Sequence, residues 1–260
     1  MCSSDLSFGN DIINGGDGSD SLIYAWLDGS SILNGITVDL SGDDDFVTGV
    51  DEDLNQVFRD DLTDIEGFWG TVSDDTFIGD NNANGFAGGY GGSDTFTGGL
   101  GDDGFRFTDS ENVDKVTDFR GASGTENDIL RFDESFGLEF NAHGTDEYIN
   151  ASTNDATKIN TMDYQIIGVT DVISDLSDMT TVASVFDNAV NAAGNGTDDG
   201  TYFVGSDGDG SNAVDHSKVF YWEGDINENS AIDADELKHF VDLEGFTNIA
   251  SLTTDHFEIT

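Results

Sequence analysis

Short apolar segments alternate with glycine- and aspartate-rich segments through the first half of the chain. Gly15 to Ile23 reads GGDGSDSLI and Gly98 to Arg106 reads GGLGDDGFR. In both, glycines at the first, second and fourth positions and an aspartate at the sixth precede a large apolar residue at the eighth. Degenerate copies of this nonapeptide occupy Phe8–Ile13, Gly70–Ile78, Gly79–Ala87 and, after an insertion at Gly88, Gly89–Thr97. The period predicts a tight turn and a short strand in every repeat.

The large apolar residues of the repeats define the expected interior. Each begins a short strand two residues after the aspartate position, so its side chain should point inward. The sequence predicts that these residues stack as one interior ladder, formed by Ile13, Leu22, Phe77, Phe86, Phe96 and Phe105. Ordinary glycine–aspartate turns in an acidic protein are the alternative. Two complete and four partial copies, mostly in one phase, argue against that alternative.

The residue types of the repeat suit a metal ion. Glycine allows positive φ angles and lets backbone carbonyl oxygens approach one another. The aspartate adds a carboxylate, and Ca²⁺ takes about six to eight oxygen ligands of these kinds. We therefore expect several Ca²⁺ ions between stacked turns. The carboxylate ligands would be Asp11, Asp20, Asp75, Asp94 and Asp103, and the turn residues of the sites Gly9, Gly15, Asp17, Gly18, Gly98, Leu100 and Gly101.

Some copies depart from the pattern. Asn84 stands at the aspartate position, and Ser73 and Asn82 replace the fourth glycine. An amide oxygen carries no charge, and serine and asparagine adopt positive φ less readily than glycine. The sites around residues 70–87 should therefore be weaker or incomplete.

The nonapeptide resembles the calcium-binding repeat of RTX proteins. Residues 36–40 and 62–68 resemble the spacer between RTX repeat blocks, and residues 113–119 and 127–133 resemble the segment that closes them. The resemblance implies a mainly β fold: a Ca²⁺-stabilised right-handed parallel β-roll over residues 7–133, with a spacer at about 24–69. It also implies secretion to the cell exterior through a type I secretion exporter, the expected partner.

Residues 134–260 lack the repeat and predict a small α+β C-terminal region. Strands are expected at 164–169, 201–204 and 218–222. Apolar residues from Val182 to Ala193 at helical spacing predict a helix, capped by Asp178 or Thr180 and ended by Gly194. Asp207 and Asp209 fall in the loop between the last two strands. A solvated hairpin tip is the preferred interpretation of that loop, with a cation site as the alternative.

A second calcium candidate lies at residues 225–236. Oxygen-bearing side chains stand at loop positions 1, 3, 5, 9 and 12, and position 7 would supply a carbonyl, which is the EF-hand pattern. Serine replaces the usual glycine at position 6, and a plain acidic loop that caps a helix is the alternative. Leu237, Phe240 and Val241 predict that a helix follows, ended by Gly245. The candidate ligands are Asp225, Asn227, Asn229, Ala231, Asp233 and Glu236.

Charge excludes several functions. The chain has 260 residues, with 54 Asp plus Glu against 8 Lys plus Arg and a formal net charge of −46. This balance excludes nucleic-acid binding through phosphate neutralisation and argues against docking on anionic membranes. Leu, Ile, Val and Phe make up about a quarter of the chain, above the roughly 20% typical of disorder. The chain can form a core, but a thin one for its charge, so an external cation is expected to join the fold.

The ends of the chain carry weaker signals. Residues 1–6, MCSSDL, resemble translated adapter sequence and are expected not to be native, with more protein upstream. The single cysteine, Cys2, has no intramolecular disulfide partner. Residues 252–260 are acidic and apolar, and they resemble the C-terminal target region of type I secreted proteins.

No catalytic motif is found. The four histidines are scattered, and neither HExxH nor GxSxG occurs. We therefore expect a calcium-binding structural and export module rather than an enzyme. Two other origins stay open: the tail of an exoenzyme such as a protease, lipase or polysaccharide-modifying enzyme, or the terminus of a large adhesin. A halophilic cytosolic protein would explain the acidity but not the repeat.

Overall fold

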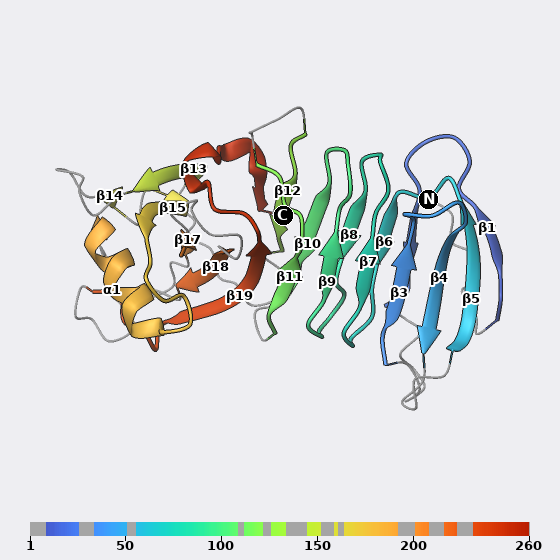
Figure 1. The fold of residues 1–260 in the computed structure, drawn as a ribbon, viewed down its shortest axis with the longest axis horizontal. Coiled ribbons are helices and arrows are strands. Elements are labelled where there is room, and N and C mark those ends of the chain that lie inside the picture. The colour runs from blue at the N-terminus through green and yellow to red at the C-terminus, as the bar shows by residue number, and fades with distance from the viewer. Residues whose placement is uncertain are drawn as a thin grey trace.

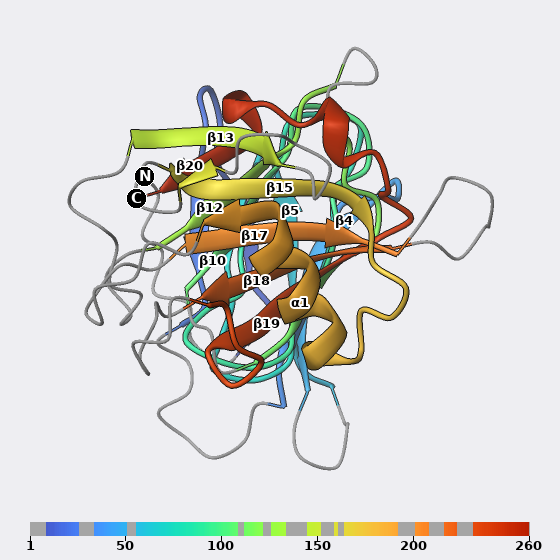
Figure 2. The ribbon, with the colours of Figure 1, turned by 90° about the vertical axis from the view of Figure 1, so that its left-hand side faces the viewer.

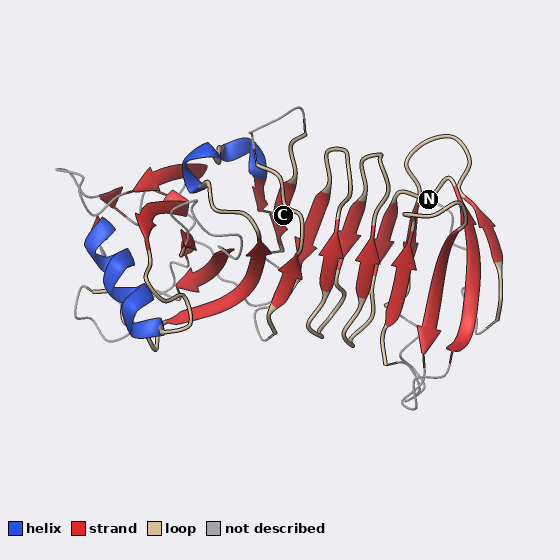
Figure 3. Cartoon of the chain, in the orientation of Figure 1, coloured by secondary structure: helices blue, strands red, loops and turns tan. Residues whose placement is uncertain are grey.

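The fold is mainly β. The computed structural model describes residues 9–25, 34–50, 56–108, 112–121, 126–133, 145–151, 159–160, 164–191, 201–207, 216–222 and 231–259. Residues 1–6 lie outside this part. Within it there is one α-helix, α1 (Met179–Ala189), and two short 3₁₀ turns, η4 (Ile249–Ser251) and η5 (Thr254–His256) (Figure 3). No helix among the described residues has the length and apolar character needed to cross a membrane.

Two large sheets contain nearly all strands. Sheet A has twelve, in the spatial order β1 (Ile12–Asn14), β5 (Gln56–Thr63), β4 (Asp45–Val50), β3 (Ile36–Asp39), β7 (Thr76–Ile78), β9 (Thr95–Thr97), β11 (Asp114–Val116), β19 (Leu237–Glu244), β18 (His216–Trp222), β17 (Thr201–Ser206), β15 (Tyr164–Val172) and β13 (Thr145–Ala151). Sheet B has six: β2 (Ser21–Ile23), β6 (Gly67–Trp69), β8 (Gly85–Ala87), β10 (Gly104–Phe107), β12 (Ile129–Phe132) and β20 (Phe257–Ile259). A separate pair joins β14 (Ile159–Asn160) to β16 (Val190–Asn191).

The repeats coil between the two sheets. From β6 to β12 the chain enters sheet B and sheet A in alternation, and strands within each sheet pair in parallel (Figure 1). Thr76 pairs with Thr95 and Gly85 with Gly104, so one coil of the chain takes about two nonapeptides. A three-residue strand and a six-residue turn account for this period. Parallel sheets of this form are compatible with a β-roll.

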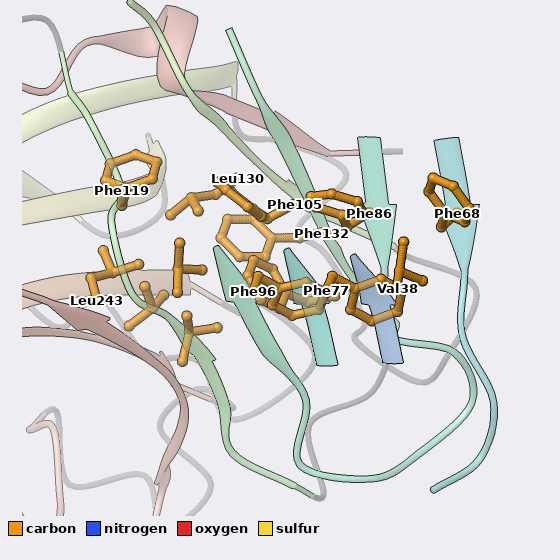
Figure 4. Close-up of a cluster of buried hydrophobic side chains, with 14 of the residues drawn as sticks. Val38, Phe68, Phe77, Phe86, Phe96, Phe105, Phe119, Leu130, Phe132 and Leu243 are labelled. Atoms are coloured by element: carbon orange, nitrogen blue, oxygen red, sulfur yellow. The ribbon is translucent and has the colours of Figure 1, made fainter. Parts of the chain in front are cut away.

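The large apolar residues form two ladders that face one another, and the single ladder expected from the sequence is wrong. In sheet A, Val38, Phe77, Phe96 and Val116 are direct register partners. In sheet B, the partners are Leu22, Phe68, Phe86, Phe105 and Leu130. Rings from the two ladders interdigitate, with the Phe77 and Phe86 centroids 5.3 Å apart and those of Phe96 and Phe105 5.9 Å apart (Figure 4). Consecutive repeats alternate between sheets, which a linear pattern does not show.

The spacer stays within the roll. Its strands β3, β4 and β5 form an antiparallel meander inside sheet A. β5 then pairs in parallel with β1, and β3 pairs in parallel with β7. The meander therefore fills the place of several parallel strands without interrupting the sheet.

The second half extends sheet A and packs a helix on it. β17, β18 and β19 are antiparallel neighbours, and β15 pairs with β17 in parallel. All six residues of β17 are buried, because one face meets the roll and the other meets α1 (Figure 2). Tyr202 and Val204 belong to the main core of the roll, whereas Phe203 packs in a second core with Phe186 of α1. The main core thus runs across the boundary expected at residue 133.

In the second half, the strands expected at 164–169, 201–204 and 218–222 are confirmed as β15, β17 and β18, whereas the helix expected after residue 236 is wrong. Leu237, Phe240 and Val241 do not form a helix; they lie in β19, antiparallel to β18. The register shifts at Phe240, which has no direct partner, so a bulge reproduces helical spacing within a strand. The helix expected from Val182 is confirmed as α1 as far as Ala189, but Val190 and Asn191 form β16, so the expected continuation to Gly194 is wrong. Asp178 caps it, because its Oδ1 accepts a 3.0 Å hydrogen bond from the Thr180 N–H.

Candidate calcium sites

Two rows of turns connect the sheets. We call the turns that lead from sheet A into sheet B the first row; they are described at residues 15–20, 64–66, 79–84, 98–103, 117–121 and 126–128. The turns that lead from sheet B back into sheet A form the second row, described at residues 70–75 and 88–94. In both rows the acidic residue of a repeat stands at the junction between a turn and the next strand.

A ladder of carboxylates runs along the second row. Oδ1 of Asp75 accepts a 2.7 Å hydrogen bond from the N–H of Ile36. The N–H of Asp75 donates to Oδ1 of Asp94 at 2.8 Å, and the N–H of Asp94 donates to Oδ1 of Asp114 at 2.8 Å. Each acid therefore holds the backbone of the preceding coil. The structure brings the predicted ligands Asp75 and Asp94 together as neighbours in this ladder.

The first row repeats this arrangement. The N–H of Asn84 donates to Oδ1 of Asp103 at 2.8 Å, and the N–H of Asp103 donates to Oδ1 of Asp128 at 3.1 Å. At the N-terminal end, the N–H of Asp20 donates to Oε2 of Glu66 at 3.0 Å. Asn84 keeps its own place in the row, where its Oδ1 accepts a bond from the Asp80 N–H, but it contributes no charge. The expectation that this site is weaker stays a prediction.

The acid that precedes β1 has its own partner. The N–H of Asp11 donates to Oδ1 of Asp60 at 3.0 Å, and the hydroxyl of Tyr24 donates to Oδ2 of Asp60 at 2.9 Å. Burial raises the pKa of Asp60 and, together with the Asp60 charge, the pKa of Tyr24. Asp11 is therefore joined to a buried acid in β5 rather than to the other predicted ligands.

Burial makes the ladder acids costly when ionised. Asp75, Asp94 and Asp103 are 2%, 3% and 1% exposed. Desolvation raises the pKa of Asp75 and of Asp103 to about 7, although backbone hydrogen bonds act in the opposite direction. For Asp128 the same cause raises the pKa to about 6. A divalent cation beside these carboxylates would offset this cost, so the donor set fits Ca²⁺.

The glycines of the complete repeat keep the turns close. Gly99 has a φ of 95°, and a Cβ there would lie 2.0 Å from the carbonyl oxygen of Asp80 in the neighbouring turn. The carboxylate of Asp103 packs against Gly98 of the same repeat, since a Cβ on Gly98 would lie only 2.3 Å from Oδ2 of Asp103. The N–H of Leu100 donates to the Asp80 carbonyl at 2.9 Å. These contacts leave room for carboxylate and carbonyl oxygens but not for side chains.

The remaining predicted turn residues lie where the repeat puts them. The turn at 15–20 joins β1 to β2, and the N–H of its Gly15 donates to the carbonyl of Thr63 at 3.0 Å. Asp17 and Gly18 are exposed at the tip of this turn, and Gly101 takes a φ of 118° in the turn 98–103. Gly9 precedes β1 and is half-buried.

A guanidinium occupies the C-terminal end of the first row. Nη1 of Arg120 donates to the carbonyl oxygen of Gly99 and to Oε2 of Glu126, both at 2.5 Å. The backbone N–H of Arg120 donates to Oδ2 of Asp128 at 2.7 Å, and the Arg120 charge lowers the pKa of that acid against the effect of its burial. The Arg120 side chain therefore contacts the carbonyl oxygen of Gly99, and its positive charge stabilises the ionised form of Asp128.

The EF-hand-like loop is described only in part. Asp225, Asn227 and Asn229 lie outside the described residues, whereas Ala231, Asp233 and Glu236 lie inside them. Glu236 is 3% exposed, and its Oε2 accepts hydrogen bonds from Nε1 of Trp222 at 3.2 Å and from the Asp233 N–H at 3.3 Å. Because a strand follows Glu236, the loop is not followed by the helix that an EF-hand has.

Four ladder acids were absent from the ligands predicted from the sequence: Asp60, Glu66, Asp114 and Asp128. Each stands two residues before a buried large apolar residue of a strand, as the acid of a repeat does. None follows a run of glycines, so the full nonapeptide pattern passes over them. A search for an acidic residue two positions before a buried apolar residue would have found all four.

Side chains alone do not make the sites. Among the described residues, no three His, Cys, Asp or Glu side chains converge as metal ligands. A cation in the turn rows would therefore draw on backbone carbonyl oxygens as well as carboxylates. No protein-family model matches this chain, and a search of curated proteins finds no match either.

Proposed function

We propose that the chain is a calcium-binding structural and export module of a secreted protein. Its first half is a right-handed β-roll of the RTX type, and its C-terminal region is the segment read by a type I secretion exporter. The module is not an enzyme. It folds when Ca²⁺ binds at the cell exterior, where several ions fill the two turn rows.

The carboxylate ladders carry this proposal. Each row has a buried acid once per coil, and hydrogen bonds from backbone N–H groups to carboxylates join the acids of successive coils. The acids are Asp75, Asp94 and Asp114 in the second row, and Asp103 and Asp128 in the first. A fold that needed only hydrogen-bond acceptors at these places could use asparagine, whose amide oxygen accepts without a charge. Carboxylates cost more to bury, and a bound cation is the physical reason for retaining them.

The negative net charge explains why Ca²⁺ binding would be coupled to folding. At −46 the chain repels itself, and the ladder acids add desolvation costs when the roll forms. Where Ca²⁺ is scarce, as inside a cell, these terms favour an open chain that an exporter can pass. Where Ca²⁺ is abundant, the free energy of ion binding becomes free energy of folding.

The loop at 225–236 is proposed as a further Ca²⁺ site. Glu236 is a buried carboxylate at the position that binds through both oxygens in an EF-hand. Its contacts with Trp222 and Asp233 hold it beside the loop. The following strand, and the serine at position 6, set this loop apart from a sensor EF-hand.

Circular dichroism and calorimetry with and without Ca²⁺ test the proposal. We expect the chain in EDTA to keep part of its strand signal but to unfold at a much lower urea concentration and temperature than in Ca²⁺, with several ions bound per chain when Ca²⁺ is added. Asp94→Asn keeps an acceptor for the Asp75 N–H but removes a ligand charge, and it should weaken Ca²⁺ binding in the rows by about tenfold.

Asp43→Asn is the matched control, because it removes the same charge from an exposed position between β3 and β4. Its Ca²⁺ titration should follow that of the unmodified chain. A chain that stays fully folded in EDTA and shows no Ca²⁺-induced change would contradict the proposal. Equal effects of the two substitutions would assign the Ca²⁺ response to net charge rather than to the ladders.

A further inference from the structure

A row of glycines crosses the outer face of sheet B. Gly67, Gly85 and Gly104 are direct register partners on three adjacent strands, β6, β8 and β10. Neighbouring strands lie about 4.8 Å apart, so the row spans about 10 Å; Ser21 covers Gly67, Arg131 covers Gly104, and Gly85 between them is open. Glycine weakens a strand interior, so three in register have a cost in stability.

The glycine row is the floor of a groove of about 250 Å³. Ser21 and Ile23 lie at one end, and Trp69, Arg106 and Arg131 line the side and the other end. A Cβ on Gly85 would meet nothing within 4 Å, whereas one on Gly104 would meet the guanidinium of Arg131. The middle of the groove is therefore open, and Arg131 closes one end.

Two arginines stand side by side at this groove. Arg106 of β10 and Arg131 of β12 are direct register partners. Like charges placed opposite one another destabilise a sheet. The chain has only 8 Lys plus Arg residues against 54 acids. Two of these few cationic residues therefore stand side by side where acidic or neutral residues would be expected. Ion pairs with Asp133 and Glu258 offset part of this repulsion, and an anionic ligand that contacts both guanidinium groups would offset more of it.

Both guanidinium groups keep donors for such a ligand. Nη1 of Arg106 lies 3.3 Å from Oδ2 of Asp133, and Nε of Arg131 lies 2.6 Å from Oε2 of Glu258. A guanidinium carries five N–H donors, so one ion pair leaves several donors on each arginine in the described structure. The two acids hold the arginines in place and keep the local charge near zero when no ligand is bound.

An aromatic side chain lies beside the arginines. The Arg106 guanidinium lies 5.8 Å from the centroid of the Trp69 ring, and Tyr90 packs against the same indole at 5.8 Å. Tyr90 is 41% exposed. The groove therefore combines a flat floor, an aromatic wall, a serine hydroxyl and paired cations.

We propose that this groove binds an acidic saccharide. A sugar ring lies over Gly85 and against Trp69, and its carboxylate or sulfate group accepts hydrogen bonds from Arg106 and Arg131. A small inorganic anion would not need a floor of three glycines. A nucleic acid would bring a phosphate at every nucleotide to a chain of net charge −46, whereas the proposed ligand needs one carboxylate or sulfate group at the arginine pair. The side chains involved face outward from sheet B, so this site is separate from the turn rows.

Calorimetry on the full chain in saturating Ca²⁺ and physiological salt tests the site. The probes are a tetrasaccharide with a single uronate residue, a tetrasaccharide with a single sulfate group and the neutral cellotetraose. We expect an acidic probe to bind and the neutral one not to bind. Comparison of the carboxylated and sulfated probes identifies which acidic group is preferred. Equal binding of cellotetraose, or no binding of any probe, would overturn the proposal.

Three variants locate the binding. Arg131→Gln should reduce the affinity at least tenfold. Gly85→Val fills the open floor with a strand-forming residue whose Cβ meets no neighbour, so it should abolish binding while the circular dichroism spectrum is unchanged. Arg59→Gln is the control: Arg59 also pairs with an acid, Asp61, and lies over a ring, Phe46, but on sheet A. Binding that survives Gly85→Val, or that Arg59→Gln weakens equally, would contradict the site.

Discussion

The backbone N–H of Asp94 donates a 2.8 Å hydrogen bond to Oδ1 of Asp114, twenty residues further along the chain and on the next strand of sheet A. The acid thus accepts a bond from a buried backbone group and also adds a negative charge to the core. These two effects act in opposite directions on stability when no cation is bound. They can be separated, because asparagine keeps the acceptor and alanine removes it.

Asp103 allows this separation in the first row. In EDTA at pH 8, Asp103→Asn should raise the free energy of unfolding by on the order of 1 kcal/mol, because it removes a desolvated charge whose pKa burial raises to about 7. Asp103→Ala should be less stable than Asp103→Asn by about 1–3 kcal/mol, since the Asn84 N–H loses its acceptor. Urea unfolding monitored by circular dichroism measures both differences. Equal stability of the two variants would contradict the acceptor role.

The calcium-free protein should be more stable in mild acid than at neutral pH. The pKa of Asp75 and of Asp103 is about 7 and that of Asp128 about 6 in the folded state, above the ordinary value of 3.8. The folded state therefore binds more protons than the unfolded state between about pH 4 and 7, and stability falls as the pH rises through this window. Thermal unfolding in EDTA at pH 5 and pH 8 checks this sign. A higher midpoint at pH 8 would be the opposite result.

Ca²⁺ should change that dependence on pH. In the proposed function the ion requires deprotonated carboxylates, so its affinity should rise as the pH increases towards 7. Ca²⁺ titrations at pH 5 and pH 8 measure this change. Affinity that is independent of pH would place the ions away from Asp75, Asp103 and Asp128.

Arg120 should stabilise the end of the first row without calcium. Arg120→Ala removes the cation that contacts the Gly99 carbonyl and Glu126, and in EDTA it should cost about 1 kcal/mol, because the guanidinium is partly exposed and screened by solvent. Arg120→Lys should restore part of the loss. Hydrogen exchange at Gly98 and Gly99 gives a local measure, since their N–H groups donate to Asp118 in the adjoining turn. Unchanged exchange in Arg120→Ala would show that the guanidinium does not support the turn.

Two glycines of the roll should respond in opposite ways to alanine. Gly99→Ala should destabilise the chain by roughly 2 kcal/mol or more, because its φ is 95° and the added carbon would approach the Asp80 carbonyl. Gly85→Ala should be neutral or slightly stabilising, because the new carbon meets no neighbour within a strand. Thermal unfolding in Ca²⁺ compares the pair. Similar losses at both positions would contradict the close stacking of turns.

Much of the roll follows from local pattern. The two-residue spacing in sequence from Asp94 to Phe96, or from Asp103 to Phe105, is enough to predict an acid at the end of a turn and a buried ring in the strand that follows. Alternation of side chains along a strand has a period of two residues, so an acid two positions before the ring is a local property. The helix around Val182 was predictable for the same reason, since its apolar spacing and its cap at Asp178 are local.

The sequence by itself determined the repeating turn and strand, the inward-facing apolar residues and the acids at the junctions. Only the tertiary structure decided that the apolar residues form two facing ladders, that Asp114 and Asp128 continue the acid rows, and that Leu237 to Glu244 is a strand. These features depend on pairing between distant segments, such as Val116 with Leu243 and Leu130 with Phe257. The spacing of Leu237, Phe240 and Val241 is that of a helix, but β18 pairs with this segment and a bulge at Phe240 accommodates the spacing in a strand. Burial against β18 contributes more to stability than the intrinsic preference of these residues.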